Sequence, residues 1–318
     1  MVSTNSLREP TVCQLHFRMS FRCRWALSLL LGVSIALLVG CPPSDVCLQC
    51  GAFAVVGSFS DPGIQECSGL VASQIHSGIL WVHNDSGDAA RVFAVKEDGT
   101  LRGEYALQGV SATDWEDIAW GPCSSGGWSD CLYIGDIGDN AKLRSEVQIY
   151  RVREPTVPLE GPVVYESLNG VEQFNCAYPD GPHDAETLLV DPDSGIPYII
   201  TKDAAGNTGV YRSPQPLTPG ETTTLEKLTV LTSGSYLTAG DVSPNGSRII
   251  LRDYLTSFEY PRLSGQSFAQ IFDNAPCTIL PALEIQGEAL AIGPSSLEVY
   301  TTSEGQGAPI HRALCSAP

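Results

Sequence analysis

Positive charge is scarce in this sequence. Its 318 residues include 18 Lys and Arg against 36 Asp and Glu, which gives a formal net charge of −18 at pH 7. Binding to nucleic acid or to anionic lipid relies on clustered Lys and Arg, so neither is expected as a partner. A metal cation or a cationic ligand suits such a chain better.

Helical periodicity and several catalytic motifs are also missing. From Ala52 to Pro318, no segment of ten or more residues has apolar residues at helical spacing, and short β-rich runs alternate with Gly and Pro. This pattern predicts an all-β fold. The motifs GxSxG and HExxH and the P-loop are absent, which argues against a serine esterase, a zinc protease or a nucleotide switch.

The one long apolar run, Trp25–Gly40, follows Arg22 and Arg24 and indicates a signal peptide. It is short for a membrane-spanning helix of about 20 residues. Its end, Leu38-Val39-Gly40-Cys41, resembles the bacterial lipobox. That resemblance implies that residues 1–40 are removed, that Cys41 carries a lipid, and that the protein faces away from the cytoplasm in the bacterial cell envelope. An ordinary secretory peptide or an uncleaved anchor helix is the alternative. Removal of the leader brings the formal charge near −21, because four basic residues and one acidic residue are lost.

Eight of the eleven cysteines remain once Cys13 and Cys23 are lost with the leader and Cys41 is lipidated. An even number outside the cytoplasm predicts disulfides. Cys123 and Cys131 bracket a Gly- and Ser-rich turn, and we expect them to pair. A CxxC motif lies in the predicted tether, residues 41–51. It lacks the second CxxC of a zinc site, so a local disulfide or two solvent-facing thiols are expected there. The other pairings stay open among Cys47, Cys50, Cys67, Cys176, Cys277 and Cys315.

A phrase recurs five times in residues 52–318. The copies are ECSGLVA at 66, DWEDIAW at 114, DAETLLV at 184, TAGDVSP at 238 and QGEALAI at 286. Two further β-rich runs follow each copy after polar, Gly-rich turns, and a weaker fourth run follows most of them, such as residues 223–232 after the third. This repeat predicts a β-propeller with one four-stranded blade per copy.

Five blades are expected. The repeats are spaced by 48, 70, 54 and 48 residues, and the 70-residue interval leaves a sixth blade as an alternative. The last repeat lacks a fourth run, whereas an unassigned run, AFAVVGSFS, lies at residues 52–60. We expect this N-terminal strand to complete the last blade and close the ring, which removes exposed strand edges.

One column of the repeat is rich in carboxylates. Aligned copies place these residues in it: Ser68, Glu116, Glu186, Gly240 and Glu288. First strands line the channel of a propeller, so one column should form one ring. Carboxylates about 8 Å apart repel by roughly 2 kcal/mol per pair at an effective dielectric of 20, so they need protons or a cation. An all-oxygen ligand set favours calcium over zinc. The alternative is a water-filled tunnel with solvated or protonated acids.

A second acidic set ends the second run of each repeat: Asp85, Asp136, Asp203, Asp253 and Glu304. Asp is common in turns for structural reasons. Asp85 and Asp136 flank Gly-rich loops that would let a ligand approach the backbone, and they are candidate catalytic residues. His183 is a third candidate, as an acid, a base or a residue that orients Glu186, although a surface histidine is the simpler interpretation.

The order of these phrases resembles that of calcium-dependent apyrases, five-bladed propellers that hydrolyse nucleoside di- and triphosphates. The matching phrases are ECSGL with LWVHNDSG, WEDIAW, AETLL and GEALAI. The resemblance implies that Ser68, Glu116, Glu186 and Glu288 are calcium ligands. Gly240 departs from the serine of that family, so a carbonyl, a water or Asp241 would have to substitute. The sequence is more similar still to uncharacterised bacterial secreted proteins that carry DWEDIA and YIGDIGDN phrases, which implies a fold without an activity.

Three functions follow as hypotheses. The first is a calcium-dependent hydrolase of phosphate esters or anhydrides, in which the metal polarises a phosphoryl oxygen. The second, which we favour, is a module that binds a small anionic ligand through the metal or binds a protein partner. The third is a glycoside hydrolase with paired carboxylates. The fold alone does not choose among them.

Overall fold

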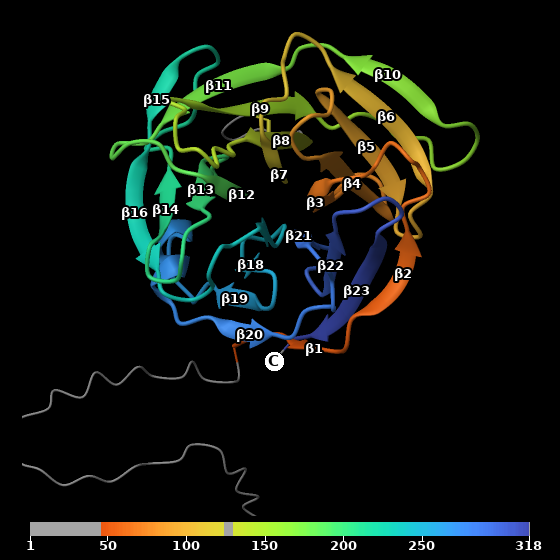
Figure 1. Ribbon diagram of the computed structural model, residues 1–318. Coiled ribbons are helices and arrows are strands. Elements are labelled where there is room, and N and C mark those ends of the chain that lie inside the picture. The colour runs from red at the N-terminus through yellow and green to blue at the C-terminus, as the bar shows by residue number, and fades with distance from the viewer. Residues whose placement is uncertain (1–45, 124–129, 318) are drawn as a thin grey trace, which may run out of the picture. The chain divides into compact units, whose positions relative to one another are not determined.

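The computed structural model describes residues 46–123 and 130–317, which form five β-sheets around a common axis (Figure 1). One strand of each sheet lies next to the axis, and these inner strands contact one another in a closed circle. They are β3 (Cys67–Ala72), β7 (Trp115–Pro122), β12 (Ala185–Val190), β17 (Ala239–Val242) and β21 (Gly287–Ile292). The chain is therefore an all-β, five-bladed propeller, as the repeat predicts.

The first and second blades have five strands each. From the axis outward, the first blade continues with β4 (Ile79–Asn84), β5 (Arg91–Lys96), β6 (Leu101–Leu107) and β10 (Val164–Leu168). The second continues with β8 (Asp130–Asp136), β9 (Val147–Arg153), β11 (Glu172–Ala177) and β15 (Thr222–Thr224). The outermost strands β10 and β15 are parallel to their neighbours, whereas the other pairings are antiparallel.

The other three blades follow the same outward order. The third continues with β13 (Pro197–Thr201), β14 (Thr208–Arg212) and β16 (Glu226–Leu231). The fourth continues with β18 (Arg248–Arg252), β19 (Ser257–Pro261) and β20 (Cys277–Ile279). The fifth continues with β22 (Glu298–Ser303) and β23 (Pro309–Ser316), beside which lie β2 (Ala54–Ser58) and β1 (Gln49–Cys50).

The long interval after the second repeat forms no sixth blade in the residues that the structure describes. It supplies β10, which extends the first blade, and β11, the fourth strand of the second. The fourth strand of the third blade lies where the sequence predicts it, because β16 falls within residues 223–232. The residues just before it form β15, which pairs with β11 of the second blade.

The N-terminal strand closes the ring. β2 pairs antiparallel with β23, with Val55 opposite His311, which confirms the predicted closure. β1 extends the same edge and places Cys50 opposite Cys315, to which it is disulfide-bonded. Cys47 is bonded to Cys277. The expectation of a local CxxC disulfide or free thiols was therefore wrong, because β1 and the residues just before it lie against the propeller and each cysteine meets a different partner there.

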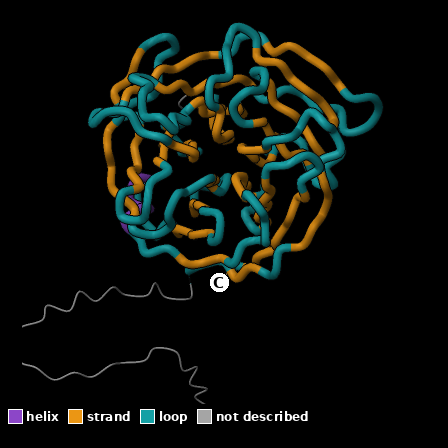
Figure 2. Tube along the Cα trace, viewed as in Figure 1, coloured by secondary structure: helices purple, strands orange, loops and turns teal. Residues whose placement is uncertain are grey.

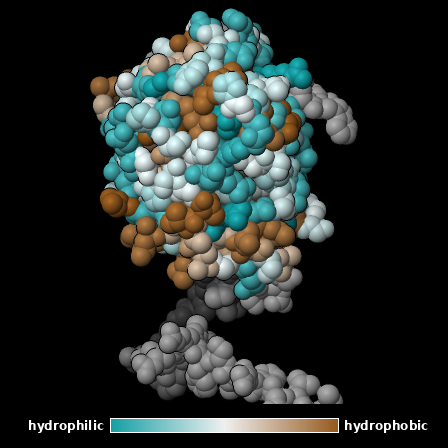
Figure 3. Space-filling model, turned by 90° about the vertical axis from the view of Figure 1, so that its right-hand side faces the viewer, coloured by the Kyte–Doolittle hydropathy of each residue, from teal (hydrophilic) through white to brown (hydrophobic). Residues whose placement is uncertain are grey.

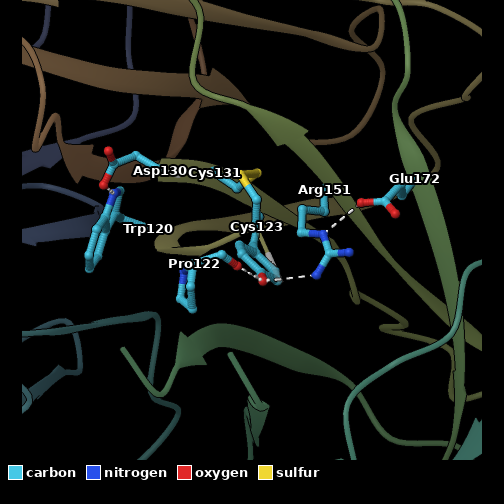
Figure 4. Close-up of a disulfide and its surroundings, with 8 residues drawn as sticks. Trp120, Pro122, Cys123, Asp130, Cys131, Arg151 and Glu172 are labelled. Atoms are coloured by element: carbon cyan, nitrogen blue, oxygen red, sulfur yellow. Dashed lines mark hydrogen bonds and ion pairs between the residues drawn. A yellow bond between two sulfur atoms is a disulfide. The ribbon is translucent and has the colours of Figure 1, made fainter. Parts of the chain in front are cut away.

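A third disulfide joins Cys123 and Cys131, the pairing expected from the sequence (Figure 4). Beside it, Trp120 donates a hydrogen bond to Asp130 at 3.0 Å, and Arg151 pairs with Glu172 at 2.8 Å. Three disulfides indicate an oxidising compartment. The predicted leader and Cys41 lie outside the described residues.

Helix is confined, in the described part of the chain, to a short 3-10 segment, η1 (Phe268–Asp273), in the connection between β19 and β20 (Figure 2). No helix among these residues is long and apolar enough to cross a membrane.

Apolar side chains packed between neighbouring blades form the core. Trp81 of β4 and Trp115 of β7 are fully buried in one cluster that the first two blades share. Two buried carboxylates add polar links between blades. Asp117 of β7 accepts hydrogen bonds from the N–H groups of Ile118, at 2.8 Å, and of Leu188 in β12, at 2.9 Å. Asp241 of β17 does the same for Val242 and for Ile292 in β21, both at 2.7 Å.

Candidate metal centre

A β-bulge interrupts the pairing of the inner strand in four of the five blades. In each case the bulge lies at the column that the sequence alignment singled out, and the extra residues are Ser68, Glu116, Glu186 and Glu288. A bulge bends a strand and redirects the side chain of its extra residue. The backbone therefore presents these four side chains in the same way from four blades.

The fourth blade differs from the others. Gly240 pairs regularly with Leu251 and forms no bulge. A Cβ atom at this position would lie 2.6 Å from Leu251 Cδ2 and 2.9 Å from Thr187 Cγ2, so a serine would not fit without movement of its neighbours. Of the five predicted metal ligands, Gly240 can offer only its backbone.

Three carboxylates converge at the bulge in β7. They belong to Asp85 at the end of β4, to Asp114 just before β7, and to Glu116 in β7, and one oxygen of each lies within 4.8 Å of the others. Glu116 is buried, whereas Asp85 and Asp114 are half-buried. The sequence predicts Glu116 as a metal ligand and Asp85 as a catalytic residue, whereas Asp114 belongs to neither predicted set.

The loop after β8 packs closely against this carboxylate triad (Asp85, Asp114 and Glu116). The Gly138 N–H donates to the Asp114 carbonyl at 3.2 Å. A methyl group on Gly138 would overlap Glu116 Oε1 and Asp114 Oδ2. The loop can therefore pack this closely against the carboxylates only because residue 138 has no side chain. Three carboxylates without nitrogen or sulfur donors suit a hard cation such as calcium, so the donor set fits the predicted metal.

A lysine occupies another part of the ring. The Lys202 ammonium forms an ion pair with Glu186 and lies 3.2 Å from the Tyr254 hydroxyl, which donates to Glu288 at 2.8 Å. Glu186 and Glu288 are therefore connected through Lys202 and Tyr254. Ser68 donates to the Glu116 carbonyl at 2.6 Å. The four predicted side-chain ligands do come together, but only Glu116 belongs to the triad.

Burial and mutual repulsion disfavour the charged forms of these acids. Burial raises the pKa of Glu116 well above the usual range, and the charges of Glu186 and Asp85 add to this effect. Burial also raises the pKa of Glu186 to about 8, although Lys202 opposes the shift. For Asp85, burial raises the pKa to about 6, with contributions from Asp114 and Glu288. Without a cation, the cluster therefore retains protons near neutral pH.

The second acidic set is divided between two roles. Glu304 belongs to the cluster, since burial and its contact with Glu288 raise its pKa to about 8. Asp253 accepts hydrogen bonds from the N–H groups of Leu255 and Thr256, at 2.8 and 2.7 Å, and so closes a turn. Asp203 pairs with Lys142 at 2.9 Å.

Asp136, a candidate catalytic residue, has a fully buried carboxylate that holds the backbone in front of β7. It accepts hydrogen bonds from the N–H groups of Thr113 and Asp114, at 3.0 and 3.1 Å, and pairs with Arg144 at 2.8 Å. The structure therefore places Asp136 behind Asp114, where it positions a member of the triad.

His183, the third catalytic candidate, belongs to a separate polar group. Its Nε2 lies 3.0 Å from Asp180 Oδ1 and 2.9 Å from the Tyr211 hydroxyl. Lys227 pairs with the same Asp180 at 2.9 Å.

Sequence reasoning missed Tyr254 and Gly138. A Gly-rich loop after Asp136 hinted at Gly138, whereas nothing in the repeat pointed to Tyr254.

Fold and site together define an all-β, five-bladed propeller with a buried acidic group that could hold a metal ion. No protein-family model matches the chain, and no curated protein matches it. Among solved structures, three are similar to it at low identity. One is a gluconolactonase, XC5397 from Xanthomonas campestris, with 8% identity and a TM-score of 0.43 over 79% of this chain and 72% of that chain.

The second is Raptor from Chaetomium thermophilum, with 11% identity and a TM-score of 0.43 over 82% of this chain and 29% of that chain. The third is a glucose dehydrogenase, with 10% identity and a TM-score of 0.47 over 82% of this chain and 98% of that chain. Similarity at this level assigns no family.

Proposed function

We propose that this protein is an extracytoplasmic calcium-binding β-propeller, held at the bacterial cell envelope by a lipid on Cys41, and that its metal centre docks a small anionic ligand or a protein partner. The observation that carries this proposal is the convergence of the Asp85, Asp114 and Glu116 carboxylates within 4.8 Å. Calcium takes six to eight oxygen ligands, so three carboxylates leave positions for backbone, water and ligand oxygens.

The position of the triad supports a docking role. Its members lie at the starts of inner strands and the ends of second strands, which meet at one end of the axis. Because Asp85 and Asp114 are half-buried while Glu116 is buried, an ion there would be reached from the side of the two aspartates. An anionic group could then complete its coordination.

A calcium titration of the melting temperature tests the metal. Calcium at one hundred times its dissociation constant should add about 2.7 kcal/mol to the free energy of unfolding. Glu116→Gln should fold and lose this response, because it removes one buried carboxylate. Glu160→Gln is the matched control, since its side chain is 92% exposed. An unchanged melting temperature at millimolar calcium would refute the metal centre.

A second candidate is a calcium-dependent phosphohydrolase, and the position of Lys202 favours it. Its ammonium lies in another part of the ring, between Glu186 and Tyr254, where it could bind a phosphate oxygen. A bound divalent ion would supply Lewis-acid polarisation of a phosphoryl oxygen. The test measures phosphate release from nucleotides and sugar phosphates with and without calcium. Turnover that is lost in Lys202→Met and in Glu186→Gln would favour the enzyme over the binding module.

A further inference from the structure

An exposed apolar surface lies at the rim of the fourth and fifth blades. Its large side chains are Val55, Leu280, Leu283, Ile285 and Leu314, which are 61%, 82%, 100%, 101% and 60% exposed. They come from β2, from the segment after β20, and from β23. Figure 3 shows apolar residues gathered at its lower end, the side on which Figure 1 places β1, β20 and the C-terminus. We call these five residues the apolar face.

A groove of about 850 Å³ runs through the apolar face. Residues 47–53 line one part of it, and residues 277–283 line another, together with Val55 and His311. The Cys47–Cys277 disulfide joins these two segments directly. The groove is therefore built on covalently connected backbone. It is large enough to receive apolar chains.

The segments that form the apolar face expose no carboxylate, although the whole sequence carries a formal charge of −18. Residues 46–58 contain no charged side chain, and residues 277–285 contain only Glu284. The Glu284 carboxylate is fully buried and pairs with Arg252 at 2.7 Å. In residues 309–317, Arg312 pairs with Glu97 at 2.7 Å. The nearest acids in the neighbouring strands and turns, Glu298 opposite Leu314 and Glu97 beside Arg312, are half-buried. Segments that expose no carboxylate can approach a membrane surface that the rest of the protein would avoid.

The chain length from Cys41 connects this face to the proposed anchor. The described chain begins at Val46, next to the groove-lining Cys47, and Cys41 lies five residues earlier. Five residues span at most about 18 Å. Acyl chains on Cys41 would therefore enter a bilayer close to the apolar face.

We infer that the apolar face rests on the lipid bilayer, an inference that depends on the lipid anchor proposed at Cys41. The occupant is the membrane itself, with its interfacial acyl chains against Leu283 and Ile285 and in the groove. Transfer of an exposed leucine or isoleucine side chain into the acyl boundary of a membrane is favourable. A lipid chain together with a second apolar contact therefore anchors a protein more firmly than the lipid alone. Because the face lies at the outer edge of two blades, the ends of the propeller axis, and with them the metal centre, stay in water.

A tryptophan reporter tests this orientation in the full lipoprotein bound to phosphatidylethanolamine–phosphatidylcholine vesicles. Leu283→Trp should give blue-shifted emission that brominated lipids quench. Leu143→Trp is the matched control, because Leu143 is also exposed, at 80%, but lies in the loop that follows Gly138 beside the metal centre. The unsubstituted protein supplies the background of the native tryptophans. Adding Leu280→Glu and Ile285→Glu to the Leu283→Trp variant should abolish the quenching.

Quenching at position 283 and not at 143 is the expected result. Equal quenching at both positions, or at neither, would overturn the inference. If neither is quenched and sedimentation shows that Leu280→Glu with Ile285→Glu converts a dimer into a monomer, the face is an interface between two copies. The intact mass of the protein reports separately on the anchor. An unmodified Cys41 would show that the proposed anchor had failed, whereas an acylated Cys41 without quenching would show that only the orientation was wrong.

Discussion

The position of Glu116 depends on features outside the carboxylate triad. A bulge in β7 redirects its side chain, and Gly138 leaves the space that its carboxylate occupies. Behind them, Asp136 fixes the backbone of Asp114. At the scale of single residues, the metal centre thus rests on a strand irregularity, a glycine and a buried aspartate, each of which can be changed separately.

Gly138→Ala should weaken calcium binding about tenfold or more while the protein stays folded, because the new methyl group displaces the Glu116 and Asp114 carboxylates. Calorimetric titration with calcium measures this affinity. Gly51→Ala is the matched control, since a Cβ atom there meets only the Leu314 carbonyl, at an ordinary 3.4 Å. Unchanged affinity in Gly138→Ala would show that the ion is bound elsewhere.

Asp117→Ala should lower the free energy of unfolding by about 1–3 kcal/mol, because the Leu188 N–H in the next blade loses its buried acceptor. Urea denaturation measures the difference. Asp98→Asn serves as the control, because Asp98 lies in an exposed turn, where it accepts a hydrogen bond from Thr100. Equal stabilities of the two variants would mean that Asp117 does not link the blades.

At the scale of strands, the edges of the ring are joined by β2 and β1. Both pair with β23, so the last blade contains the two ends of the described chain. Two disulfides, Cys47–Cys277 and Cys50–Cys315, then fasten β1 to the fourth and fifth blades. This closure is covalent as well as hydrogen-bonded, which protects the otherwise open edge of β23.

Removing the Cys50–Cys315 disulfide by double substitution to serine should lower the free energy of unfolding by about 2–5 kcal/mol, because it spans 265 residues of sequence. The same change at Cys123 and Cys131, only eight residues apart, should cost less. Urea denaturation of both double variants under non-reducing conditions gives the comparison. A larger loss from the short disulfide would mean that β1 contributes little to ring closure.

At the scale of the whole molecule, an acidic chain concentrates several carboxylates around one axis and leaves the segments of the apolar face without exposed acids. The folded state must offset the repulsion at the axis with protons or a cation. In the absence of metal, burial raises the pKa of Asp85 to about 6 and that of Glu186 and Glu304 to about 8. The folded protein therefore binds protons more tightly than the unfolded chain between about pH 4 and 8.

The melting temperature in the presence of a chelator should accordingly fall as the pH rises from 5 to 8. Proton binding by these groups stabilises the fold fully below their unfolded pKa values, near 4, and this stabilisation is lost as the pH passes the raised values. Calcium should restore the melting temperature most at pH 8, because it no longer competes with protons there. Glu186→Gln should make the fall shallower. A melting temperature that rises over this range without metal would contradict the arrangement of the acids.

Much of the architecture could be read from the sequence. Alternating apolar residues and a phrase repeated five times are local features, and they predicted the five blades and the closing strand. The hairpin disulfide Cys123–Cys131 was predictable for the same reason, since its cysteines flank one turn.

Tertiary structure alone decided which acids form the triad and which cysteines pair over long distances. Asp85 joins Asp114 and Glu116 because β4 ends where β7 begins, and this proximity depends on how two blades pack. Lys202 and Tyr254 follow the second strands of their blades and contact Glu186 and Glu288. The sequence repeat does not reveal these contacts. Bulges, blade packing and the path of β1 are set by contacts between segments distant in the chain, and a single sequence does not reveal such contacts.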